Sequence, residues 1–105
     1  MERHAAARTD EVHPDRPKVV CLGGINVGLF LLPDGTWRAY RDQCPHMGAP
    51  LCRGPLQTDS PTPSLTCPLH LWEFDLSTGA WVENPAVRLT AYRVEEERGT
   101  LYVWV

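Results

Sequence analysis

The 105-residue sequence lacks several features that would assign it to a membrane or to nucleic acid. It has no run of about 18 apolar residues, the length that a transmembrane helix needs. Its polar N-terminus contains neither the apolar core of a secretory signal nor a twin-arginine pair. The net charge of −3, without a basic stripe, excludes a nucleic-acid-binding surface. These absences predict a soluble, cytoplasmic protein.

The sequence also lacks a sustained amphipathic helix pattern, and its ten prolines and eight glycines favour short strands joined by turns. One turn is Pro33-Asp34-Gly35, which lies between two apolar runs. Short β-prone runs at such spacing are typical of an all-β sandwich or barrel. The predicted strands are residues 18–22, 26–32, 36–40, 65–67, 71–74, 80–82, 87–95 and 100–105.

The expected domain organisation is simple, since the length suits one domain with a modest core. Residues 1–17 are polar and contain two prolines near their end, which predicts a flexible N-terminal arm. Residues 18–105 are then the folded domain. Within it, residues 57–64 read QTDSPTPS and predict a long surface loop.

The four cysteines are the first indication of function. In a protein that is not exported, cysteines more often bind metals or stay reduced than form disulfides. Two of them have a nearby histidine, in Cys44-Pro45-His46 and in Cys67-Pro68-Leu69-His70. Each proline stiffens the loop that would present these ligands. Two cysteines and two histidines suit either a zinc ion or an iron–sulfur centre.

The mixed composition of the two loops favours a two-iron cluster over zinc, without excluding zinc. Zinc knuckles usually pair cysteine with cysteine in each loop. A two-iron cluster instead needs two protein ligands on each iron, so a loop that spans both irons can carry one cysteine and one histidine. The other two cysteines are interpreted as structural: Cys21 as a core residue in an apolar strand, and Cys52 as a small buried thiol.

The segments CPHMGAPL (44–51) and CPLHLWEFD (67–75) resemble the two cluster-binding motifs of the Rieske family, and the resemblance covers residues 18–105. It implies a Rieske-type antiparallel sandwich or barrel with a small cluster-binding subdomain of two loops, at about residues 41–83. The implied cofactor is one Rieske-type [2Fe–2S] cluster per chain. Cys44 and Cys67 would bind the inner iron, and His46 and His70 the outer, solvent-facing iron.

Three departures from the family pattern stand out. Twenty residues separate His46 from Cys67, slightly more than usual, and residues 57–64 account for the excess. Leu71 follows His70 where glycine is common. The usual first strand, before residue 18, is not evident in the sequence.

The residues around the two motifs predict a low reduction potential. High-potential members of the family carry a disulfide beside the cluster and Ser and Tyr hydroxyls after the second motif. Here Ala49 and Leu69 stand at the disulfide positions, and Trp72 and Phe74 at the hydroxyl positions. With fewer hydrogen bonds to stabilise the reduced cluster, we expect a potential of about −150 mV, the low end of the Rieske range.

Three apolar residues flank the ligand histidines and predict a small collar where a redox partner docks transiently: Met47, Leu69 and Leu71. No residue has the pattern of a catalytic acid, base or nucleophile, so we expect an electron-transfer component and not an enzyme by itself. The resemblance implies a ferredoxin that passes one electron from a flavin-dependent reductase to a terminal oxygenase. Two alternatives stay open: a small subunit of a larger reductase such as nitrite reductase, and a structural zinc module.

Overall fold

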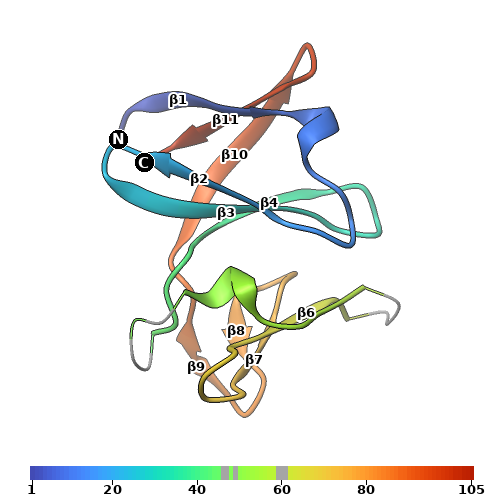
Figure 1. Cartoon of the computed structure of the whole chain (residues 1–105), viewed down its shortest axis with the longest axis vertical. Coiled ribbons are helices and arrows are strands. Elements are labelled where there is room, and N and C mark those ends of the chain that lie inside the picture. Colours follow the sequence, from blue (N-terminus) through green and yellow to red (C-terminus); the bar gives the residue numbers. More distant parts are fainter. Residues whose placement is uncertain (46–47, 49, 59–61) are drawn as a thin grey trace.

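The computed structural model describes residues 1–45, 48, 50–58 and 62–105, and its strands form two antiparallel sheets (Figure 1). This confirms the predicted all-β class. The larger sheet has the strand order β1-β11-β10-β4-β3-β2. Its strands are β1 (Arg3–Arg8), β2 (Lys18–Leu22), β3 (Ile25–Leu31), β4 (Trp37–Arg41), β10 (Ala91–Glu97) and β11 (Thr100–Trp104). The sheet curls like a barrel, so that its edge strands β1 and β2 approach each other.

The smaller sheet has the order β5-β6-β7-β8-β9 and lies below the larger one in Figure 1. Its strands are short: β5 (Leu56–Gln57), β6 (Ser64–Thr66), β7 (Glu73–Asp75), β8 (Ala80–Trp81) and β9 (Asn84–Arg88). Two 3₁₀ turns, η1 (Thr9–Glu11) and η2 (Leu51–Arg53), complete the elements. Within the described ranges, no helix is long and apolar enough to span a bilayer.

Strand β3 separates two apolar cores, because successive side chains of a strand point to opposite faces. Val27 and Leu29 lie in the barrel core with Leu101 and Val103. Phe30, on the other face of β3, lies in a second core that it shares with residues of the smaller sheet. All four residues from 27 to 30 are buried, so β3 is covered on both faces.

Tyr40 of β4 joins the two sheets. Its hydroxyl donates a buried hydrogen bond of 2.7 Å to the carbonyl oxygen of Leu76, and burial raises the pKa of this phenol. Gly79 packs against the Tyr40 ring at a φ of 78°, where a Cβ would lie 2.8 Å from the ring. Any larger residue at position 79 would therefore strain the backbone and displace the tyrosine.

The N-terminal residues differ from the predicted flexible arm. Residues 3–8 form β1, which pairs with β11 from Arg3 opposite Trp104 to Arg8 opposite Thr100. Val12 is buried in the barrel core. The strand was not predicted from the sequence because β1 is an edge strand with mostly exposed or half-buried side chains, so its apolar pattern is weak.

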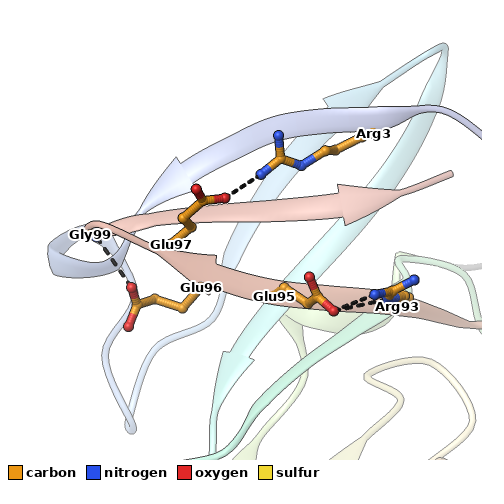
Figure 2. Close-up of polar contacts among 6 residues, drawn as sticks. All are labelled: Arg3, Arg93, Glu95, Glu96, Glu97 and Gly99. Carbon is orange, nitrogen blue, oxygen red and sulfur yellow. Dashed lines mark hydrogen bonds and ion pairs between the residues drawn. The ribbon is translucent and has the colours of Figure 1, made fainter.

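The three glutamates at residues 95–97 lie at the β10–β11 hairpin, and each has a partner (Figure 2). Glu97 accepts a 2.6 Å hydrogen bond from Arg3 of β1, and Glu95 accepts hydrogen bonds from Arg93. Glu96 accepts the backbone N–H of Gly99 at 3.3 Å. The acidic side chains therefore make exposed contacts around the hairpin, and one of these contacts reaches β1.

Two further differences concern strand boundaries. The predicted strand at 87–95 is two strands, β9 and β10, because the chain passes from the smaller sheet to the larger one at Leu89. The Leu89 side chain is buried in the shared core, and the backbone N–H of Leu89 donates to the carbonyl oxygen of Gly79. The predicted loop at 57–64 is shorter than expected, because its end residues Gln57 and Ser64 pair as the last residues of β5 and the first of β6.

Deleting residues 1–8 should lower the free energy of unfolding by at least about 2 kcal/mol, since several β1–β11 hydrogen bonds are lost at about 0.5–1.5 kcal/mol each. Urea denaturation followed by circular dichroism measures this loss. The control is Glu97→Gln, which removes only an exposed ion pair and should change stability by less than about 1 kcal/mol. Unchanged stability of the deletion variant would mean that residues 1–8 are an arm after all.

Candidate metal centre

The first candidate ligand loop follows β4 and is closed by hydrogen bonds at its base. The N–H of Asp42 donates to the carbonyl oxygen of Asn26 at 2.8 Å, and Asp42 Oδ1 accepts the N–H of Cys52 at 2.7 Å. Within the loop, the N–H of Gly48 donates to the carbonyl oxygen of Cys44 at 2.7 Å. These contacts hold Cys44 at the start of a turn. The predicted ligand His46, with Met47 and Ala49, lies outside the described residues.

The second loop connects β6 to β7 and is also closed at its base. The N–H of Cys67 donates to the carbonyl oxygen of Trp72 at 2.8 Å. The N–H of Leu71 donates to the carbonyl oxygen of Cys67 at 2.9 Å. His70 lies within this closed turn. Leu71, directly after it, has a φ of 59°, in the left-handed region where glycine is preferred.

The two loops bring three of the four predicted ligands together. The candidate ligand atoms of Cys44, Cys67 and His70 all lie within 4.8 Å of one another. Cys67 Sγ and His70 Nδ1 are 3.8 Å apart. Both cysteines are fully buried, whereas His70 is partly exposed. The described part of the site is thus a buried pair of thiols with an imidazole on the solvent side.

The Rieske [2Fe-2S] domain model matches residues 2–93. The chain belongs to the Rieske [2Fe–2S] domain family. This membership indicates a Rieske-type [2Fe–2S] cluster as its cofactor and electron transfer as its chemistry, and it does not support the alternative of a structural zinc module. The match begins at residue 2, in agreement with β1 as part of the domain.

Relatives of this Rieske domain occur in different assemblies. It is 33% identical over 86 residues to the oxygenase component of dicamba O-demethylase from Stenotrophomonas maltophilia, which covers 74% of this chain and 24% of that protein. A solved structure described as an NADH-dependent nitrite reductase small subunit from Mycobacterium tuberculosis matches with a TM-score of 0.82 and 27% identity, covering 97% of this chain and 93% of that one.

A third match, a chain in the reduced complex between oxygenase and ferredoxin in carbazole 1,9a-dioxygenase, has a TM-score of 0.83 and covers 98% of this chain and 28% of that one. At 20% identity it shows the shared fold alone. The chain spans only 19% and 24% of the length of two curated relatives, one of them the demethylase component.

The donor set of the Rieske domain fits the cofactor that its family implies. Iron–sulfur clusters are held by thiolates, and in the Rieske type two imidazoles replace two of them. Buried sulfurs beside a partly exposed imidazole match this division between the two irons. The surrounding core is apolar, with Leu51, Leu65 and Phe74 fully buried next to the two cysteines.

Close backbone packing supports the loops. A Cβ on Gly54 would lie 1.7 Å from the carbonyl oxygen of Thr66, the residue before Cys67. Only glycine therefore allows the η2 turn, which ends at Arg53, to approach the end of β6. This contact helps to place the second loop relative to the first.

Two tryptophans flank the second loop. The ring centroids of Trp72 and Trp81 are 3.6 Å apart, with an interplanar angle of 7°, so the indoles are stacked. Both pack against the core that contains Cys44 and Cys67. An aromatic pair contributes about 0.5–1.5 kcal/mol beyond its buried area, whereas a left-handed non-glycine residue such as Leu71 costs about 1–2 kcal/mol. The two effects are of similar size.

The predicted apolar collar is present in the part of it that the structure describes. Leu69 is 69% exposed and Leu71 is 74% exposed, on either side of His70. Val82, outside this collar, is also an exposed apolar side chain (54%), and its N–H donates to the carbonyl oxygen of Glu73 in β7.

The remaining cysteines differ from each other. Cys52 was predicted to be buried; it is partly buried and packs against the shared core, and a Cβ on Gly28 would lie 2.4 Å from its sulfur. Cys21 is exposed, so its prediction as a core residue was wrong. In β2 the inward positions are Val20 and Leu22, and the strand alternation turns Cys21 outward.

In the folded protein, iodoacetamide at mildly alkaline pH should modify Cys21 and leave Cys52 unmodified. The thiolate is the reactive form, and burial, together with the charge of Asp42, raises the pKa of the Cys52 thiol well above its usual range. Mass spectrometry of tryptic peptides locates the modification, with urea-unfolded protein as the control in which Cys52 becomes reactive. Equal modification rates at both cysteines in the folded protein would contradict the described packing.

Proposed function

We propose that this Rieske domain is a one-electron carrier whose cluster is held by Cys44, His46, Cys67 and His70, and that it passes electrons from a flavin-dependent reductase to a terminal oxygenase. The observation that carries the proposal is the convergence of Cys44, Cys67 and His70 at one end of the small sheet. When bound, the cluster would supply reversible one-electron redox chemistry at iron.

The protein residues divide into those that enclose the site and those that face a partner. Cys44 and Cys67 are buried with the apolar core around them, which keeps water from the sulfur side. His70 is partly exposed between two exposed leucines, Leu69 and Leu71. A partner that covers these leucines would bring its own redox centre close to the imidazole.

The proposed partner contact is small and therefore transient. A short apolar collar buries much less area than a stable complex requires, and electron-transfer complexes lie at the low end of interface sizes. The acidic run at residues 95–97 is at the opposite end of the molecule from the small sheet (Figure 1). We therefore expect partner recognition to depend on apolar contact at the collar more than on that run.

A second candidate function, the small subunit of a nitrite reductase, is favoured by one specific observation. The Mycobacterium tuberculosis small-subunit structure superposes on this chain with a TM-score of 0.82 at 27% identity, over 97% of this chain. A cytoplasmic location suits both roles and stays a prediction.

The experiment that tests cluster binding is to measure visible absorption, reduced-state EPR, iron and acid-labile sulfide on the purified protein. We expect two irons and two sulfides per chain and the low average g value of a Rieske centre. Pull-down from the native host then separates the two roles. A stable complex with a large flavin- or haem-containing chain favours the subunit role, and a free protein that is reduced by a flavin reductase and oxidised by an oxygenase favours the carrier.

His70→Ala and His46→Ala should each abolish the Rieske EPR signal and reduce bound iron to near zero, because each removes one of only two ligands of the outer iron. The control is His13→Ala, since His13 is exposed on the segment between β1 and β2. Iron and sulfide assays with EPR measure the outcome. A normal Rieske spectrum in His70→Ala would refute the ligand assignment.

The reduction potential should be about −150 mV, at the low end of the Rieske range. Trp72 and Phe74 stand where high-potential members carry hydroxyl donors, and Leu69 stands at a disulfide position. Protein-film voltammetry measures the potential directly. A value above about +100 mV, within the upper part of the range, would show that hydrogen bonds from other groups compensate.

A further inference from the structure

The backbone next to His70 is strained. Leu71 has a φ of 59°, and the only other described non-glycine residue with positive φ is Arg98, in the β10–β11 hairpin turn. Arg98 is followed by Gly99 in a turn type that requires such angles. Leu71, by contrast, is in the ligand loop and is 74% exposed, so packing of its own side chain does not hold it there. Its N–H donates to the carbonyl oxygen of Cys67 at 2.9 Å, and a contact of the neighbouring residue adds to this hydrogen bond.

The neighbouring residue, Trp72, provides that contact. Its indole is stacked on that of Trp81, with centroids 3.6 Å apart. Trp81 belongs to β8 and pairs with Phe74 of β7, whose side chain is fully buried. One partner of the stack is therefore attached to the rigid small sheet, and the other forms the end of the ligand loop.

The same tryptophan also closes the loop through its backbone. Its carbonyl oxygen accepts the N–H of Cys67 at 2.8 Å. A shift of Trp72 would move that carbonyl away from Cys67 and would release Leu71 on its other side. The stack thus acts on both ends of the turn that contains His70.

We propose that the Trp72–Trp81 stack is a clamp that positions His70 relative to Cys67 and holds Leu71 in its left-handed conformation. Trp72 and Trp81 are positioning residues in this sense and are not ligands. The proposal deepens the proposed function and rests on it, since it concerns the geometry of a ligand loop.

The clamp has an expected effect on the reduction potential. Two ferric ions, two sulfides, two thiolates and two neutral imidazoles sum to zero charge, and reduction adds one negative charge. An apolar environment disfavours the charged form. Because both tryptophans pack against the core that holds the two cysteines, removal of one ring admits water to that side. We expect the potential to rise.

The experiment compares Trp81→Ala, Trp81→Phe and the control Trp104→Ala in the 105-residue protein carrying its cluster. Trp104 lies in β11 of the larger sheet, where its ring is contacted by Arg3 and Arg93. Trp81→Ala should shift the potential upward, change the reduced-state EPR line shape and lose the cluster several-fold faster in the presence of an iron chelator. Trp81→Phe, which keeps a stacked ring, should behave nearly as the wild type, as should Trp104→Ala.

A signal of the stack itself is independent of the cluster. Two stacked indoles produce an exciton couplet in circular dichroism, which should be present in the wild type and in Trp104→Ala and absent in both Trp81 variants. Its absence in the wild type would overturn the clamp whatever the cluster does. A wild-type protein that shows the couplet but binds no cluster would instead refute the proposed function.

Leu71→Gly tests the link to backbone strain. If the clamp holds Leu71 in a strained conformation, glycine at this position removes the strain and should slow cluster loss in the Trp81→Ala background much more than in the wild type. Equal effects of Leu71→Gly in the two backgrounds would overturn the coupling. Faster cluster loss in Trp81→Ala with an unchanged potential and EPR spectrum would show ordinary packing and would overturn the positioning role.

Discussion

The complete burial of two cysteine side chains is the constraint on which the rest of this structure depends. Cys44 and Cys67 come from different loops, yet both lie in the apolar core that the two sheets share. Thiols behave as small hydrophobic groups, so the same packing that folds the small sheet also brings the two sulfurs together. The candidate site is therefore built into the core and is not a surface addition.

That shared core exists because β3 and β4 are covered on both faces. Phe30 and Tyr40 face the small sheet, while Leu29 and Ala39 face the barrel interior. The buried hydrogen bond from Tyr40 to Leu76 adds a directional contact between the two sheets. A change in these strands would alter the position of the small sheet and, through it, the ligand loops.

The second loop combines an apolar surface with an unfavourable backbone. Leu69 and Leu71 expose most of their side chains beside His70, and Leu71 does so at a positive φ. A glycine at position 71 would avoid both unfavourable effects. Leucine at this position suits a docking surface, and the proposed clamp would offset its conformational cost. Electron exchange and partner contact would then use the same short turn.

The sequence by itself determined the class of the fold and the type of cofactor, and it predicted the residues of the site. Alternating side chains and frequent turns predicted most strands, including residues 18–22 without error, because periodicity is a local property. The two Cys–His motifs pointed to one cofactor because ligand chemistry depends on residue type and short spacing. Three of these four residues meet in the structure, and His46 stays a prediction.

Only the tertiary structure decided the features that depend on distant partners. The pairing of β1 with β11, the passage from β9 to β10 at Leu89 and the outward orientation of Cys21 each depend on which strand or core lies alongside. The same holds for the stack of Trp72 on Trp81 and for the left-handed Leu71. Local propensity does not predict such contacts, because their free energy comes from residues that are brought together only when both sheets have formed.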